Sequence, residues 1–251
     1  MVLLLFVDLD PDLAALRPLG GFFVLRTGGE AVRPSATLAQ AYAEPVSEAH
    51  GDDLGLRVRK VADTLRAPEL RIAASVAQQG LAARLWSVTL GCAALYGRIP
   101  DLAPRLLHWD PDGSAPDDLW LAEVRSLPAD PATVADAVLH GHLEPLNAVL
   151  GARYRVAAGL LWGNAGSALA GAARQLDRWA RAGGRTDAAA GARTLTAELF
   201  THPLLAGTGT FTATAFRRRS CCLYYRVPGG GVCGDCCFTR APRSSPRAPS
   251  G

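Results

Sequence analysis

The sequence predicts a mainly α-helical fold, with a small strand-containing N-terminal region and a cysteine-rich C-terminal loop. Apolar residues recur every three or four positions in long stretches between residues 54 and 200, the pattern of helices that bury one face. Alternation typical of strands is confined to short segments. Hydrophobic residues make up 49% of the 251 positions, which is enough for a substantial core.

We divide the chain into four regions on these patterns. Residues 1–65 form a mixed N-terminal region, and residues 66–208 form the helical body. Residues 209–240 form a cysteine-rich segment. Residues 241–251 hold three prolines, three serines and two arginines, so they are predicted to be disordered.

The first elements are a strand, a turn and two helices. Residues 20–26, which read Gly-Gly-Phe-Phe-Val-Leu-Arg, predict a short strand, and residues 28–34 predict a turn. From Leu54 the apolar spacing predicts a helix that Pro68 ends, and a longer helix starts at Glu69.

The helical body continues after a loop rich in proline and aspartate at residues 110–118. Asp130 and Pro131 are typical of a helix start, and Pro145 kinks or restarts that helix. Further helices are predicted at 153–181 and 187–200, and residues 210–216 alternate as a strand or extended segment. The helix at 153–181 carries a stripe of small residues that lets another backbone approach closely: Gly159, Gly163, Gly166 and Ala170.

The chain is predicted to be cytoplasmic. Its start has an apolar run of six residues without a basic flank, which is too short for a secretory signal. The stretch between Arg155 and Arg174 is uncharged but mostly Ala and Gly, so it fits a buried helix better than a membrane span. In a reducing compartment six cysteines are not expected to form structural disulfides, and the clustered ones are therefore expected to bind metal.

Four cysteines fall within sixteen positions: Cys221, Cys222, Cys233 and Cys236. Thiolates gathered in this way select iron–sulfur clusters, zinc or copper(I). Zinc sites favour ligands separated by two to four residues, whereas adjacent cysteines in an extended segment point to opposite faces. The pattern therefore favours a [2Fe–2S] cluster, which takes two thiolates at each iron.

Glycines and arginines surround these cysteines. The three glycines of Pro228–Gly231 allow the backbone to adopt conformations that other residues rarely adopt. Residues 217–251 contain seven arginines and one acid, although the net charge of the whole chain is only +3. A cluster with four thiolates becomes more negative on reduction, so nearby cations favour the reduced form. The candidates for this tuning are Arg217, Arg218, Arg219 and Arg226.

The residues from Phe216 to Arg226, followed by Cys233-Gly-Asp-Cys236, resemble the C-terminal signature of the ferric-siderophore reductase (FhuF-like) family, whose pattern is CC-x10-C-x2-C. Weaker resemblance at residues 71–86 and 160–169 extends it over about residues 15–240. The resemblance implies a cytoplasmic [2Fe–2S] oxidoreductase that transfers one electron to the iron(III) of an imported ferric siderophore. It also implies that the four cysteines are the cluster ligands.

One electron is enough to release the metal, because iron(II) is softer and less charged than iron(III) and leaves oxygen chelators more easily. The sequence has no dinucleotide fingerprint, so an electron-donor protein is the expected partner.

Two alternative functions stay open. One is a zinc-binding knuckle in a nucleic-acid or protein interaction module, and the other is an iron–sulfur sensor or electron carrier. We expect no nucleic acid partner, and the sequence leaves open a peripheral contact with the inner membrane face.

Other candidate residues receive structural interpretations. Cys237 departs from the family pattern, and Cys236 is preferred as the ligand; Asp235 is assigned to a turn and Cys92 to the core. His140 and His142 are interpreted as polar helix-end residues, not as a metal pair.

Two further groups remain. His50, His108 and His202 are isolated in the sequence. Trp86, Trp162 and Asn164 lie in the family-like stretches and are assigned to core packing, with substrate docking as the alternative.

Overall fold

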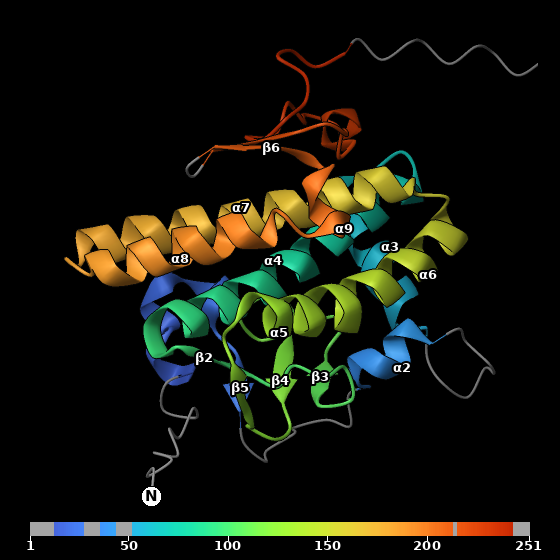
Figure 1. Ribbon diagram of the computed structural model, residues 1–251. Helices are drawn as coiled ribbons and strands as arrows, with labels where there is room; N and C mark the ends of the chain where they lie inside the picture. Colours follow the sequence, from blue (N-terminus) through green and yellow to red (C-terminus); the bar gives the residue numbers. More distant parts are fainter. Residues whose placement is uncertain (1–12, 28–35, 44–51, 213–214, 243–251) are drawn as a thin grey trace, which may run out of the picture.

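The computed structural model describes residues 13–27, 36–43, 52–212 and 215–242, and the predicted mainly α-helical fold is confirmed (Figure 1). Two long helices, α4 (Leu70–Tyr96) and α7 (Ala158–Ala182), pack along each other, and α8 (Thr186–Leu199) lies beside α7. The predicted turn at 28–34, residues 243–251 of the predicted tail and His50 lie outside the described residues.

The two helices predicted on either side of Pro68 are confirmed as α3 (Asp53–Leu65) and α4. The Asp52 side chain caps α3 by accepting a hydrogen bond from the Gly55 backbone N–H at 3.0 Å. Helix α4 buries residues on all sides because it is rich in leucine and alanine, as expected of a central helix. Gly97 ends it in the left-handed conformation, at φ 65°.

The helix predicted from Pro131 changes its winding part-way. Asp130 caps α5 (Pro131–Ala135), as predicted, by accepting from the Thr133 N–H at 3.0 Å. A π-helix, η3 (Asp136–Leu143), follows, and α6 (Glu144–Tyr154) carries Pro145 in its first turn. Proline has no N–H to donate to the preceding turn, so the restart at Pro145 is confirmed. The π-helix was not predicted.

The strands of the body are short and lie together below the helices in Figure 1. Strand β4 (Leu119–Leu121) pairs in parallel with β1 (Arg26–Thr27) and antiparallel with β3 (Leu107–Trp109), and β2 (Arg98–Pro100) pairs with β5 (Ser126–Pro128). The predicted strand at 20–26 is wrong except at its end, where Arg26 begins β1. Residues 21–23 form a 3₁₀ helix, because Gly20 turns the chain at φ 110° and Phe23 packs against α4 at Gly91.

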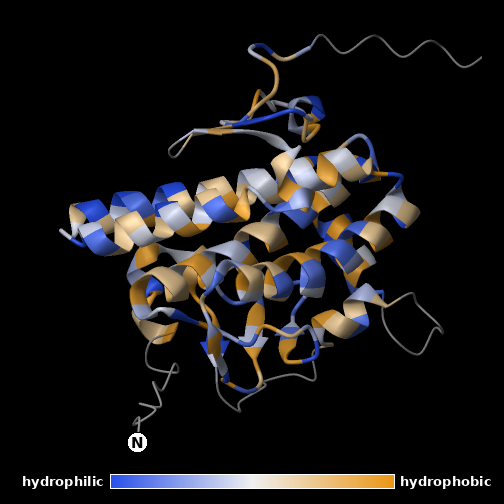
Figure 2. Cartoon of the chain, in the orientation of Figure 1, coloured by the Kyte–Doolittle hydropathy of each residue, from blue (hydrophilic) through white to orange (hydrophobic). Residues whose placement is uncertain are grey.

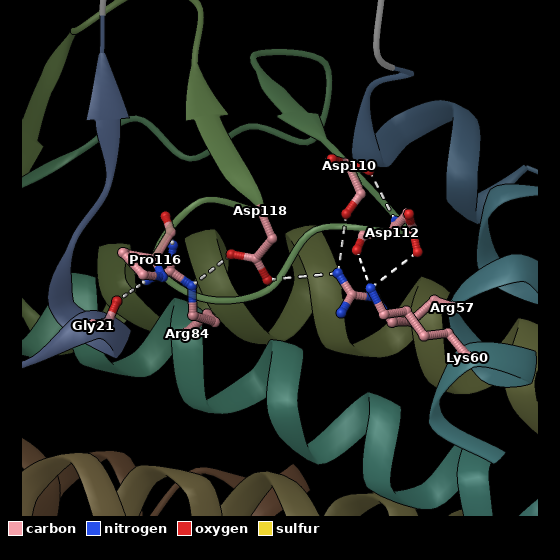
Figure 3. Close-up of polar contacts among 8 residues, drawn as sticks. All are labelled: Gly21, Arg57, Lys60, Arg84, Asp110, Asp112, Pro116 and Asp118. Atoms are coloured by element: carbon pink, nitrogen blue, oxygen red, sulfur yellow. Dashed lines mark hydrogen bonds and ion pairs between the residues drawn. The ribbon is translucent and has the colours of Figure 1, made fainter. Parts of the chain in front are cut away.

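The loop predicted at residues 110–118 is fastened to the helices by ion pairs (Figure 3). The Asp118 carboxylate lies 3.2 Å from Arg84 Nε of α4 and 3.7 Å from Arg57 Nη2 of α3. Arg84 is almost completely buried, and it also donates to the Gly21 carbonyl at 2.8 Å. Lys60 pairs with Asp112 at 3.0 Å. The strand layer is thereby tied to α3 and α4.

The buried helix predicted between Arg155 and Arg174 is confirmed as the first part of α7, in which Leu161, Ala165 and Leu169 are fully buried. Figure 2 shows hydrophilic residues on α7 and α8 mainly at the end of these helices that lies away from the hairpin. Among the described residues, no helix combines the length and apolar character that a membrane crossing requires.

Candidate iron–sulfur centre

The chain reaches its cysteines through a β-hairpin that lies on the outer face of α7 (Figure 1). After α9 (Pro203–Ala206), β6 (Gly209–Thr212) pairs antiparallel with β7 (Ala215–Arg218). The single strand or extended segment predicted over 210–216 is instead two paired strands, because the chain reverses direction between Thr212 and Ala215. In β7, Phe216 and Arg218 are buried, whereas Arg217 is exposed.

The small residues of α7 make room for this hairpin. A Cβ atom at Gly166 would lie 2.7 Å from Thr208 Oγ1 and 3.1 Å from Phe216 Cζ, and one at Gly163 would lie 2.2 Å from Ser220 Oγ. These distances are shorter than ordinary van der Waals contact. The predicted stripe of small residues therefore receives a neighbouring segment of the chain, which is the hairpin and the start of the cysteine segment.

We call residues 219–238 the cysteine segment. After Cys222 the chain turns at Leu223, at φ 68°, into a short 3₁₀ helix, η4 (Tyr224–Arg226). Gly229 has φ 74°, and a Cβ at Gly230 would lie 2.3 Å from the Tyr224 carbonyl oxygen. Close packing therefore excludes a side chain at Gly230, and the left-handed backbone of Gly229 disfavours one there. The loop brings Cys233 back to Cys222.

The sulfur atoms of Cys222 and Cys233 lie 3.7 Å apart. Their hydrogen bond lowers the pKa of Cys222 to about 7, and the same contact, together with burial, raises the pKa of Cys233. The contact therefore favours the loss of one proton from the pair.

The charges of the remaining thiols of the segment influence one another. Burial raises the pKa of Cys221, and the charges of Cys237 and Cys236 raise it further. Burial and the charge of Cys236 raise the pKa of Cys237 in the same way. Backbone N–H groups donate to two of these sulfurs, from Leu223 to Cys221 at 3.3 Å and from Phe238 to Cys236 at 3.4 Å.

These groupings fit the donor set of a [2Fe–2S] cluster, which takes two thiolates at each iron and is tuned by N–H groups that donate to sulfur. All six cysteines are outside disulfides. In the described part of the chain, no three metal-ligating side chains are gathered as they would be around one ion. Adjacent cysteines separate into different pairs, as expected for an extended segment.

Asp235 fastens the cysteine segment to α7. It is 8% exposed, and its carboxylate accepts from Ser167 Oγ at 2.6 Å and pairs with Arg174 Nη1 at 2.9 Å. Its backbone carbonyl accepts from the Arg218 N–H at 3.0 Å. The side chain is therefore engaged in an ion pair with the helix, consistent with its assignment to a turn and not to a ligand.

A buried polar chain fastens the segment from the other side. Ser75 of α4 donates from Oγ to the Cys222 carbonyl at 2.9 Å. Asn164 of α7 donates from Nδ2 to the Ser75 carbonyl at 2.9 Å, and its Oδ1 accepts from Arg218 Nη2. Because Ser75, Asn164 and Arg218 are all almost fully buried, this chain links both central helices to the cysteines.

Two family models match the sequence. The model described as FhuF 2Fe-2S C-terminal domain matches residues 218–238. The model described as ferric iron reductase FhuF-like transporter matches residues 72–212, more than half of the chain. The chain belongs to this FhuF-like ferric iron reductase family. The match of the C-terminal model therefore supports a [2Fe–2S] cluster in this segment. No curated protein matches the chain.

The structure of this FhuF-like protein separates the four arginines that the sequence grouped together. Arg218 is 2% exposed. Arg226 pairs with Glu69 at 2.6 Å, and Arg217 donates to the Cys237 carbonyl at 3.3 Å. Arg219 is exposed. Only Arg218 among the four is enclosed with the cysteine thiols.

The other candidates take structural positions in the FhuF-like fold. Cys92 and Trp86 are fully buried in the core. His142 is buried, with Nδ1 2.9 Å from the Tyr42 hydroxyl and Nε2 2.5 Å from the Leu102 carbonyl, whereas His140 is exposed and pairs with Glu144. The two histidines therefore do not form a metal pair.

Three candidates remain. His108 lies in β3, His202 caps α9, and Trp162 is partly buried against the core. Sequence reasoning missed Ser75, Ser167 and Arg174 as anchors of the cysteine segment. Helical spacing alone carries no signal that distinguishes them from other polar helix residues.

Proposed function

We propose that this protein is a [2Fe–2S] ferric-siderophore reductase whose cluster ligands are Cys221, Cys222, Cys233 and Cys236. The supporting observation is that the segment matched by the iron–sulfur family model gathers these cysteines against α4 and α7. We further propose that residues 209–240 act as the cluster-binding unit, that residues 66–208 form the body that carries it, and that residues 1–65 and 241–251 are an N-terminal region and a tail.

When bound, the [2Fe–2S] cluster supplies one-electron transfer. The proposed ligands would hold the cluster close to the protein surface. Cys222 is 3% exposed, whereas Cys221, Cys233 and Cys236 are partly exposed. A bulky ferric chelate can therefore approach the thiolate ligands without entering the protein. Tyr224, Val232 and Phe238 are exposed apolar side chains of the same segment, and they offer a contact surface for the chelate.

The proposed reaction adds one electron to chelated iron(III) and yields iron(II), which leaves an oxygen chelator more easily because it is softer and less charged. No proton transfer is needed, which agrees with the structural positions of His140 and His142. We propose that the electron comes from a donor protein and that the iron(II) is released in the cytoplasm. A peripheral contact with the inner membrane face belongs to the same proposal.

The test begins with protein purified without oxygen from iron-replete cells. It is expected to be reddish-brown and to contain about two iron and two labile sulfide per chain. The reduced protein is then mixed with one ferric siderophore and an iron(II)-specific dye, and one equivalent of iron(II) is expected per cluster. Stoichiometric zinc in a colourless protein contradicts the proposal. A coloured protein that releases no iron(II) from any siderophore class instead favours the sensor or electron carrier.

Single cysteine variants test the ligands. Cys222→Ser and Cys233→Ser are expected to lose the visible spectrum, because each removes one thiolate of the pair at 3.7 Å. Cys237→Ser is the matched control, since it changes a neighbouring thiol outside the proposed ligand set. Retained colour in Cys222→Ser, or lost colour in Cys237→Ser, shows that the ligand assignment is wrong.

A further inference from the structure

Arg218 is a buried cation without a matching acid. Its side chain is enclosed between the hairpin, α7 and the cysteine segment, at 2% exposure. Within the described residues it forms no ion pair with an aspartate or glutamate, and its Nη2 donates to the neutral Asn164 side chain. Asp235 lies nearby in the backbone pairing, but its carboxylate is engaged by Arg174 and Ser167.

Two donors of the same guanidinium are unused. Nε and Nη1 of Arg218 are buried and have no hydrogen-bond partner among the described residues. A buried charge is strongly unfavourable unless it is paired, and a buried donor is unfavourable unless it is satisfied. Both features indicate that the functional protein places an anionic hydrogen-bond acceptor beside Arg218.

The cysteine segment lies beside this guanidinium. Arg218 Nη2 and Ser220 Oγ both lie against Gly163 of α7, at 3.4 and 2.2 Å from where a Cβ of that glycine would be. Asn164 connects the guanidinium to Ser75, which donates to the Cys222 carbonyl at 2.9 Å. The position of Arg218 in β7 accounts for the orientation of its side chain, because successive residues of a strand face opposite sides. Arg218 therefore faces inward, whereas Arg217 and Arg219 face outward.

We propose that Arg218 is the buried counter-charge of the iron–sulfur centre, and that its guanidinium donates to the thiolate ligands and raises the reduction potential. This inference rests on the proposed function, because it takes the four cysteines as ligands. A centre with four thiolates carries one more negative charge after it gains one electron. A fixed positive charge in a water-poor position stabilises that reduced form more than the oxidised form. Arg218 is a positioning and tuning residue, not a catalytic one.

The test compares Arg218→Gln with Arg219→Gln, which removes the same charge from an exposed neighbouring position. Each cluster-loaded protein is titrated with dithionite and followed by electron paramagnetic resonance. Arg218→Gln is expected to make reduction at least tenfold less favourable, which is a shift of 59 mV to more negative potential for one electron. Arg219→Gln is expected to shift the potential less. Equal shifts in the two variants overturn the proposal.

Arg218→Lys separates charge from geometry. It keeps the charge but loses the planar donors, so its potential is expected between those of the wild type and Arg218→Gln. A potential more negative than that of Arg218→Gln overturns the role of charge.

The metal-free protein provides a second readout if Arg218→Gln does not retain the cluster. Without the cluster, Arg218 is an uncompensated buried charge, so Arg218→Gln is expected to raise the urea midpoint of the metal-free protein. A lowered midpoint shows that the protein itself compensates the charge, and it overturns the proposal. These measurements need no siderophore turnover. A wild type that binds no cluster refutes the proposed function, whereas an unchanged potential refutes only the role of Arg218.

Discussion

The close packing of the hairpin against α7 can be tested by adding one methyl group at Gly166. In Gly166→Ala the new Cβ would lie 2.7 Å from Thr208 Oγ1 and 3.1 Å from Phe216 Cζ. Neither neighbour can move freely. Thr208 Oγ1 donates to the Leu205 carbonyl at 2.7 Å, and the Phe216 ring stacks on Phe200 with centroids 5.2 Å apart. The methyl group must therefore displace the hairpin from the helix.

The expected magnitude follows from two opposing effects. Overpacking of this kind costs about 1–3 kcal/mol, whereas replacing a glycine inside a helix by alanine stabilises it by about 0.5–1 kcal/mol. Gly171 provides the control on the same helix, because the nearest atom to its added Cβ is Arg174 Nη2 at 3.9 Å, an ordinary contact. Gly171→Ala should thus be slightly more stable than the wild type, and Gly166→Ala less stable than Gly171→Ala by about 1–3 kcal/mol.

The assay is thermal unfolding of the cluster-loaded proteins, followed by circular dichroism for the helices and by visible absorbance for the cluster. For a protein of this size, about 1 kcal/mol corresponds to a shift of roughly 2–4 °C in Tm. Gly166→Ala is also expected to lose its visible absorbance before its helical signal. Equal Tm values for the Gly166 and Gly171 variants would show that the hairpin is not seated on α7 as described.

Two further predictions concern other contacts. Asp235→Asn should lower the unfolding free energy by about 1–3 kcal/mol and speed the loss of the cluster, because it removes the ion pair to Arg174 and weakens the contact to Ser167. Denaturant titration checks this, with the substitution Asp136→Asn at an exposed position as the control. Equal denaturation midpoints for the two variants would contradict the prediction. Burial lowers the pKa of His142 to about 4, so the unfolded chain binds a proton between about pH 6.5 and 4 that the folded protein does not. The unfolding free energy of the metal-free protein should therefore fall as the pH is lowered through this window, by about 1.4 kcal/mol per pH unit. The same slope in His142→Gln would refute this assignment.

Long elements with a strong period were predictable from the sequence. The helices on either side of Pro68 and the buried helix before Arg174 followed from apolar spacing and from proline. Strands of three residues were not predictable, since they are too short to show alternation, and they depend on partners far along the chain. Residues 98–100 pair with 126–128, for example. Both arms of the hairpin alternate in the same way, so the sequence pattern predicts a single strand or extended segment across them.

In the candidate site, too, local sequence patterns were predictable and contacts between distant residues were not. The spacing of the four cysteines predicted a thiolate donor set, which stays a prediction, and the glycine loop between Cys222 and Cys233 turns tightly at Gly230. The supports of this site could not be predicted, because Ser75 and Asn164 act on residues that lie far along the chain. The arginines were grouped as a patch of charge. Only the register of β7, which needs the hairpin, separates Arg218 from its neighbours.

The order of these parts along the chain has a consequence for biogenesis. Both helices that support the cysteine segment, α4 and α7, precede it in the sequence, so they are synthesised before any of its thiols leaves the ribosome. The scaffold can then be folded when iron and sulfide arrive. The cysteine segment is therefore the last part of the described fold to be placed on the helices.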